Sequence, residues 1–400
     1  MSGLIFLMCG LMPIVDTVNG FLLKGRGSSG IGTLYRLAFF ALLFVYYFYN
    51  GCTKTDYVLV ASFFLFLVFQ VVSSLGLYVK NSLELTVKLF TPMFMAAVFG
   101  RMLRRGQANR ERVCRLMDWL ALLYPITILI PYALHMGYST YYGNVGYKAF
   151  YFATNEITFA VCTMVMYLWD RLRQSLRPRW LLCFAMNGAS CVLLGSKIAM
   201  AIFLFFAGLL VAENVFIAVR KNVIRSIAIL SFAVIVGIVV LSRFGPQIAR
   251  IIARWESNLS RAESGVAFLS SHRNVFLSNT FAIFQEKGIW TMLFGWGLGG
   301  TNSVEFVEMD LFDLIFSCGF IGTIAVFALY AVLLRRLRVR AFTGWMFFGI
   351  AMFISLLGGH VLFTGLGGMS FAMLLFYIAV IPRGQELCRE RILEIRENPI

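Results

Sequence analysis

The sequence predicts an all-α polytopic membrane protein with about 12 transmembrane helices and one large loop outside the membrane. Hydrophobic residues make up 60% of the 400-residue chain, and charged residues make up only 14%. A soluble globular chain has about 25% charged residues, so these apolar side chains are expected to face lipid. Apolar stretches of membrane-spanning length also follow one another along most of the chain.

A transmembrane helix needs about 20 mostly apolar residues. We expect the first stretch to be an uncleaved span, because it lacks the positive region and the small-residue cleavage site of a signal peptide. The chain is therefore predicted to be a single integral membrane domain over 1–400. Its expected spans lie near residues 3–23, 33–50, 57–79, 83–100, 116–136, 153–170, 179–195, 198–219, 224–242, 310–334, 343–363 and 365–382.

Basic residues predict the orientation, because Lys and Arg are enriched on the cytoplasmic side of a membrane. They cluster in alternate connections, which are 101–115, 171–179, 220–225 and 335–340, and again in the tail 383–400. With twelve spans all of these lie on one side, so both termini and the tail are expected to be cytoplasmic. The net charge of +16 reflects this pattern. No basic, aromatic-rich patch indicates a nucleic-acid partner.

Residues 243–309 form the one long connection on the opposite side. Arg250, Arg254 and Arg261 share a helical face at 100° per residue, with apolar residues on the other side. Pro246 is expected to open this amphipathic helix. The helix is typical of a segment lying at the membrane interface. Its arginines either attract anionic headgroups or bind a phosphorylated ligand, since guanidinium groups suit phosphate.

Four acidic residues then fall within nine positions, although the chain has only 19. They are Glu305, Glu308, Asp310 and Asp313. Upstream, residues 243–273 carry five arginines against two glutamates. Such separated zones suit a site that holds an anionic leaving group and activates a hydroxyl nucleophile. Between the zones, the glycines of 293–300 indicate either a tight turn or a close approach of backbone to a ligand.

Several polar residues lie at the ends of spans that face the large loop. Ionisable groups in membrane segments are often functional, although each is also a candidate helix cap or packing partner. Their convergence on one side favours a common site. They are Asp16, Asn19, Asn155, Glu156, Lys197 and His360.

Taken together, these segments resemble the Wzy-type O-antigen polymerases, which are related to the O-antigen ligases. The ordered set covers nearly the whole chain, although each stretch is short. The matching stretches are Pro13–Leu23, Gly146–Glu156, Leu194–Lys197, Ser271–Asn274, Leu293–Gly297 and Val307–Gly322.

The resemblance implies a GT-C-like fold in the bacterial inner membrane with the active site facing the periplasm. It also implies donor and acceptor oligosaccharides linked to undecaprenyl pyrophosphate, inverting glycosyl transfer, and no cofactor. A flippase and a chain-length regulator are the expected protein partners. The related ligases keep a histidine where this chain has Glu308-Met309-Asp310, so the base here is expected to be a carboxylate.

Within this interpretation, Glu308 is the first candidate base and Asp310 the second, and we expect the base to be buried at the membrane mouth. The expected pyrophosphate ligands are Arg254, Arg261 and Arg273, then Arg250, Lys197 and Arg243. Asp16, Asn19, Asn155, Glu156 and His360 would orient the sugars or hold the arginines.

Other functions remain open on the sequence. A ligase would perform the same chemistry on a lipid A-core acceptor. A lipid-linked oligosaccharide flippase would need a charged central cavity and often shows repeated halves, and no internal repeat is present. A metal-dependent enzyme is also possible, because Asp310 and Asp313 are spaced to share a helical face and offer hard oxygen ligands.

Overall fold

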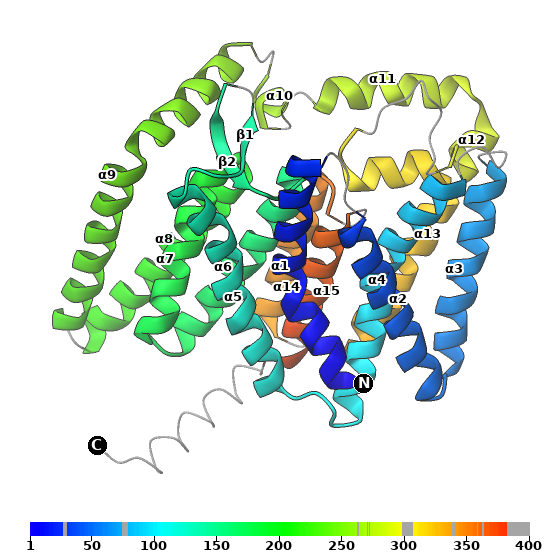
Figure 1. Cartoon of the computed structure of the whole chain (residues 1–400), viewed down its shortest axis with the longest axis horizontal. Coiled ribbons are helices and arrows are strands. Elements are labelled where there is room, and N and C mark those ends of the chain that lie inside the picture. The colour runs from blue at the N-terminus through cyan, green and yellow to red at the C-terminus, as the bar shows by residue number, and fades with distance from the viewer. Residues whose placement is uncertain are drawn as a thin grey trace.

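Helices dominate the computed structural model, which describes residues 1–26, 30–73, 79–141, 143–221, 223–261, 264–269, 271, 273–297, 307–337, 339, 341–357, 359–361 and 364–381. The long helices stand side by side as a bundle (Figure 1). A helix lies within or overlaps each predicted stretch. These helices are α1 (Ser2–Arg26), α2 (Ile31–Tyr49), α3 (Lys54–Ser73), α4 (Val79–Arg104), α5 (Arg110–Ala133), α6 (Thr154–Gln174), α7 (Pro178–Leu194), α8 (Lys197–Lys221), α9 (Val223–Arg261), α13 (Asp310–Leu337), α14 (Phe342–Leu357) and α15 (Gly365–Val380).

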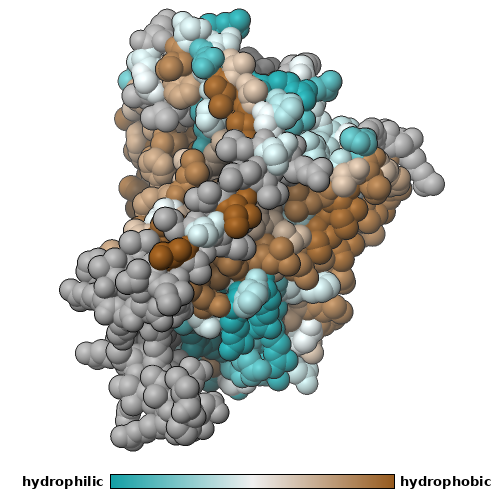
Figure 2. All heavy atoms as spheres, turned by 90° about the vertical axis from the view of Figure 1, so that its left-hand side faces the viewer, coloured by the Kyte–Doolittle hydropathy of each residue, from teal (hydrophilic) through white to brown (hydrophobic). Residues whose placement is uncertain are grey.

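Seven helices in the described part of the chain are long and apolar enough to cross a membrane, and they are α1 to α5, α8 and α13. Apolar side chains such as Leu34, Leu65 and Ile324 point outward from these helices. Figure 2 shows an apolar belt across the middle of one face, with hydrophilic residues above and below it. The chain is therefore an α-helical protein with membrane-spanning character. The helices α7, α14 and α15 are shorter, and the count of twelve spans stays a prediction.

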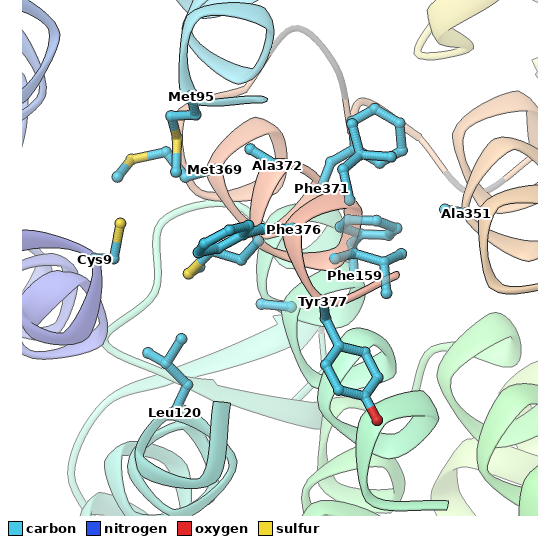
Figure 3. Packing of buried hydrophobic residues seen from close by; sticks show 14 of the residues in the cluster. Cys9, Met95, Leu120, Phe159, Ala351, Met369, Phe371, Ala372, Phe376 and Tyr377 are labelled. Carbon is cyan, nitrogen blue, oxygen red and sulfur yellow. The ribbon is translucent and has the colours of Figure 1, made fainter. Parts of the chain in front are cut away.

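The core is centred on α15, which is buried along almost its whole length. Its neighbours include α4, α5, α6 and α14. Figure 3 shows Phe371, Phe376 and Tyr377 of this helix reaching into the surrounding side chains. The ring of Phe376 stacks on that of Phe99, with 4.1 Å between their centroids. A short helix can occupy this position because protein rather than lipid surrounds it.

At one end of the bundle a buried carboxylate joins two of the basic connections. Asp56 accepts hydrogen bonds from Arg101, at the end of α4, and from Arg336, at the end of α13. Nearby, Arg110 donates to Gln174 at 2.8 Å and so links the start of α5 to the end of α6. Three basic connections therefore lie at the same end of the bundle. That this end faces the cytoplasm stays a prediction.

The opposite end carries short helices and a hairpin. α10 (Gly265–Leu269), α11 (Arg273–Glu286) and α12 (Ile289–Phe294) follow α9, and α11 lies across the top of the bundle (Figure 1). β1 (Tyr138–Tyr141) pairs antiparallel with β2 (Val145–Ala149). The expectation of an all-α chain missed this hairpin, because its apolar and aromatic residues read as loop between two spans.

The predicted span 310–334 is a broken helix. Gly319 has φ +66° and ψ −178°, which interrupts α13. The break frees the carbonyls of Phe316 and Ser317, which accept hydrogen bonds from the amides of Trp296 and Gly297 at 3.0 and 2.9 Å. A Cβ on Gly319 would overlap the backbone of Leu293. The glycine-rich stretch from 293 onward, as far as residue 297, therefore packs against protein backbone.

The prediction that Pro246 opens a separate helix is wrong. α9 continues from Val223 to Arg261 with Pro246 inside it. At 1.5 Å per residue, its 39 residues span about 58 Å, well beyond the roughly 30 Å of a bilayer core. The amphipathic segment is therefore the far end of one long helix. This end carries Arg254 to the region beside the hairpin.

Candidate functional site

A cavity of about 430 Å³ lies at the end of the bundle that carries the hairpin and α11. Parts of the chain far apart in sequence form its walls, from β1 to the segment just before α13. Cationic, amide, carboxylate and aromatic side chains all line it. The residues are Tyr141, Ala153, Thr154, Asn155, Lys197, Arg254, Trp255, Asn258, Phe268, Ser271, Arg273 and Glu308.

Two of the cations lie over aromatic rings. The guanidinium of Arg254 is 3.6 Å from the ring centroid of Tyr141, and the Lys197 ammonium is 4.0 Å from that of Phe268. Lys197 also donates to the Phe268 carbonyl. Aromatic faces attract cations while leaving their remaining N–H donors unused. Both side chains are thus positioned without a carboxylate to neutralise them in these contacts.

Arg273 is the third cation, and it is held by two acceptors. It donates to the Leu357 carbonyl at 3.0 Å and to the Glu308 carboxylate at 2.9 Å. The first bond fixes α11 to the end of α14. The second brings the predicted positive zone and the predicted acidic zone into direct contact. The basic segment and the acidic segment of the sequence therefore both contribute side chains to the same cavity.

Glu308 has an unusual backbone. Its φ of +60° is in the left-handed region, which non-glycine residues adopt only at an energetic cost. Such strain often occurs at functional sites. The Asn155 amide lies 3.5 Å from the carboxylate. The expectation that this carboxylate is buried is wrong, because 55% of its side chain is exposed.

Asp313 holds the turn that carries Glu308. Its two carboxylate oxygens accept the amides of Val307, at 2.8 Å, and Met309, at 3.0 Å. The residues on both sides of Glu308 are therefore bonded to one buried side chain. These two hydrogen bonds explain how the left-handed backbone conformation of Glu308 is maintained. In the sequence Asp313 is one of four clustered acids and a possible metal ligand, and the structure shows that it holds the turn at Glu308.

His360 completes this arrangement from the connection between α14 and α15. Its Nε2 lies 2.7 Å from Asp313 Oδ2. Burial by itself lowers the pKa of His360, but the hydrogen bond to Asp313 and the charges of Asp310, Asp313 and Glu308 outweigh it. The pKa of His360 is therefore raised above its ordinary value. His360 does not line the cavity, so it acts on the site through Asp313.

Asp310, the second candidate base, lies behind the cavity wall. It is 1% exposed and is absent from the lining residues. Its carboxylate accepts the Ser355 hydroxyl and the Val361 amide, both at 2.6 Å. These bonds tie the start of α13 to α14 and to the connection that carries His360. The geometry thus gives Asp310 a positioning role and leaves Glu308 as the carboxylate that faces the cavity.

The remaining predicted arginines differ in position. Arg250 and Arg261 are exposed on α9 and do not line the cavity. One helical turn separates Arg250 from Arg254. The Nε of Arg250 donates to the Pro246 carbonyl at 3.3 Å. The side chain of Arg243 and all of Glu305 lie outside the described residues.

Asp16, Asn19 and Glu156 lie apart from the cavity and hold helix ends. Asp16 pairs with Arg36 at 2.7 Å. Asn19 accepts the Gly32 amide at 3.0 Å in the first turn of α2. Glu156 accepts the Leu366 amide at 2.9 Å in the first turn of α15. Carboxylates are favourable at helix N-termini, which explains this last contact.

Asn155 lines the cavity, and its position depends on close packing against Gly359. A Cβ on Gly359, whose φ is +109°, would overlap the Asn155 side chain. Only glycine allows the connection next to His360 to approach so closely. This packing keeps the Asn155 amide beside Glu308. Of the residues expected to form one site, Asn155, Lys197, Arg254, Arg273 and Glu308 line this cavity.

Sequence reasoning missed several lining residues. Tyr141 comes from the unpredicted hairpin, and Trp255 is one of the apolar residues opposite the arginine face of its helix. Asn258 offered a signal that was overlooked, since it follows Arg254 by four residues and so shares its face. Phe268 lacked any signal, because α10 is a five-residue helix in the loop.

Among the described residues, no group of three or more His, Cys, Asp or Glu side chains is placed to hold a metal ion. Asp310 and Asp313, the pair considered as metal ligands, both accept hydrogen bonds from the protein. Comparisons of the chain with protein-family models, curated proteins and solved structures returned no match.

Proposed function

We propose that this protein polymerises oligosaccharide repeat units linked to undecaprenyl pyrophosphate, at the periplasmic face of a bacterial inner membrane. The family resemblance supplies this substrate and membrane. The observation that carries the proposal is the cavity in which Lys197, Arg254 and Arg273 face Glu308. A twelve-span, GT-C-like arrangement belongs to the same proposal. The chemistry requires positive charge for a leaving pyrophosphate and a general base for an attacking hydroxyl.

The three cations form the proposed pyrophosphate site. Arg254 lies over an aromatic ring, and Lys197 lies over another while donating one N–H to the Phe268 carbonyl, so the other donors of both side chains are available for phosphate oxygens. Arginine suits this role because its guanidinium group contacts phosphate in a bidentate manner. As the bond between the anomeric carbon and the phosphate oxygen breaks, negative charge grows on the pyrophosphate. The cations stabilise that charge and so lower the barrier.

Glu308 is the proposed general base. Its exposed carboxylate faces the cavity, where it would accept the proton of the acceptor sugar's hydroxyl. The hydroxyl oxygen then bonds to the anomeric carbon with inversion, and undecaprenyl pyrophosphate leaves with the bonding electrons. Asn155 is placed to orient the hydroxyl next to Glu308.

The ion pair between Arg273 and Glu308 gives this mechanism an order of events. A donor pyrophosphate is the stronger acceptor for Arg273, because it carries more negative charge than one carboxylate. We infer that donor binding draws Arg273 away from Glu308. The carboxylate is then free to accept a proton only when a donor is present.

Polymerisation of a purified lipid-linked repeat by the purified protein in detergent tests the proposal. Long glycan should appear with the wild type and disappear with Glu308→Gln, which keeps the shape of the side chain and removes the base. The control is Glu286→Gln, an exposed acid at the end of α11 outside the cavity lining. Wild-type polymer from Glu308→Gln would contradict the base. Transfer to lipid A-core, without polymer, would identify a ligase instead.

A further inference from the structure

A second cavity, of about 690 Å³, lies between the first halves of α1 and α5. These two helices pack side by side (Figure 1). The apolar walls of the groove are Phe6, Leu7, Leu11, Leu116 and Trp119, and Arg112 and Arg115 line the same cavity. Nothing in the proposed reaction uses this groove. Its combination of an apolar trough with two guanidinium groups is the chemistry of a lipid-binding site.

Small residues create the space in the groove. A Cβ on Gly3 would meet no atom within 4 Å, so this position is open. At Gly10 a Cβ would lie 3.3 Å from the ring of Trp119, and the indole Nε1 donates to the Gly10 carbonyl at 3.2 Å. Tryptophan is enriched where the polar and apolar parts of a membrane meet. This hydrogen bond fixes the ring as one wall of the trough.

The arginines at the groove keep donors for a ligand. One guanidinium nitrogen of Arg112 donates to the Gln107 carbonyl, and one of Arg115 to Glu111, both at 2.7 Å. A guanidinium group has five N–H donors, so most of them are not used by these bonds. Both side chains are exposed. A phosphate at this position would meet two guanidinium groups from successive turns of α5, of which that of Arg115 is also paired with the Glu111 carboxylate.

The groove is remote from the cavity of the candidate site. Asn155, at the start of α6, lines that cavity, whereas Gln174, at the end of α6, is bonded to Arg110 at the start of α5. Nineteen residues of helix separate the two ends, or about 28 Å. Arg112 and Arg115 therefore belong to the opposite end of the bundle. A ligand bound by them does not contact Glu308.

We propose that this groove binds one anionic phospholipid of the surrounding leaflet, with its phosphate on Arg112 and Arg115 and an acyl chain in the trough. Leu7 and Trp119 are 56% and 47% exposed, so the groove is open to the lipid phase along its side. Basic pockets between transmembrane helices commonly bind anionic headgroups. The bound lipid would join α1 to α5 and stabilise the contact between them. This inference does not depend on the proposed glycosyl transfer.

The test measures lipid binding to the delipidated full-length protein by native mass spectrometry. Phosphatidylglycerol and phosphatidylcholine of identical chains, and a polyprenyl phosphate, are added separately at matched concentrations. The wild type should retain phosphatidylglycerol preferentially. The double variant Arg112→Gln, Arg115→Gln should bind it about thirtyfold more weakly, as expected for two lost phosphate contacts. Arg105→Gln is the matched control, an exposed arginine at the same end that does not line the groove.

A groove-filling variant tests the trough separately from the charges. Gly3→Leu places a side chain in open space and should weaken phosphatidylglycerol binding without unfolding the protein. Gly208→Leu on α8, where a Cβ would also meet no atom, should leave binding unchanged. Equal retention of phosphatidylglycerol and phosphatidylcholine by the wild type would overturn the proposal. So would wild-type binding of phosphatidylglycerol by both the double arginine variant and Gly3→Leu. Preference for a polyprenyl phosphate over phosphatidylglycerol would also overturn it, because the occupant would then be a carrier lipid.

Discussion

His360 Nε2 lies 2.7 Å from Asp313 Oδ2, and the two carboxylate oxygens of Asp313 accept the amides on either side of Glu308. A histidine 52 positions away in the chain is therefore coupled to the backbone of the proposed base through a single buried carboxylate. Arg273 contacts the carboxylate of the same residue. The site is best understood as a strained turn whose backbone is held by Asp313 and whose side chain is held by Arg273.

Asp313→Asn should lower the rate of polymer formation by at least about tenfold, because an amide nitrogen cannot accept a backbone N–H and one buried amide loses its partner. The rate with purified lipid-linked repeat is the measurement. Asp118→Asn is the control, since Asp118 accepts the Tyr167 hydroxyl at 2.6 Å on the side of the bundle away from the cavity. Equal losses of activity in the two variants would mean that Asp313 acts only on general stability.

Stability should depend on pH through His360. Its pKa is raised in the folded protein by Asp313, Asp310 and Glu308, so the protonated form is favoured on folding. This contribution is fully present below the unfolded pKa of about 6.5, and it is lost as the pH rises through the higher folded pKa. Thermal unfolding of the wild type and of His360→Asn should therefore differ most in acid. A difference that grows as the pH rises would contradict the assignment.

Glu308→Gly and Glu308→Ala should separate strain from function. Both variants lose the base and should form no polymer. Glycine adopts a positive φ freely, whereas alanine does not, so the glycine variant should be more stable than the alanine variant by about 1 kcal/mol. Unfolding temperatures in detergent measure this difference. If the alanine variant proved the more stable one, the left-handed conformation at Glu308 would not hold in solution.

Arg254→Ala should reduce polymer formation severely, whereas Arg250→Ala should leave it near the wild-type rate. The two arginines are one turn apart on α9, but only Arg254 lines the cavity. Steady-state rates at several donor concentrations distinguish weaker donor binding from slower chemistry. Similar losses in both variants would indicate that the whole basic face of the helix binds an anionic surface.

The apolar periodicity of the sequence was enough to place a helix at every predicted stretch, because lipid and core both require continuous apolar segments. It could not reveal the break at Gly319, because a single glycine leaves an apolar segment as continuous in the sequence as an unbroken helix would be. The continuation of α9 through Pro246 was equally hidden, because proline is common at helix starts.

The candidate site was predictable in part, because its charged residues are segregated along the sequence. The charge segregation of Arg254, Arg273 and Glu308 is visible in the sequence, and the structure brings these residues to one cavity. The difference between Glu308 and Asp310 was not visible. It depends on which carboxylate meets Ser355 and Val361, and such contacts arise only from the packing of α13 against α14.

The break in α13 provides the last prediction. Gly319→Ala should strongly destabilise the protein and abolish activity, because a Cβ there would overlap the backbone of Leu293 and because φ is +66°. The α12–α13 contact would then open, and the first turns of α13, which carry Asp310 and Asp313, would shift. Gly349→Ala on α14 is the control, since a Cβ at that position meets no atom within 4 Å. Unfolding temperature and polymer formation should both fall in the first variant and stay unchanged in the second. A fully active Gly319→Ala protein would show that α13 is continuous in the active protein, and that Asp313 does not rely on the break to reach the turn at Glu308.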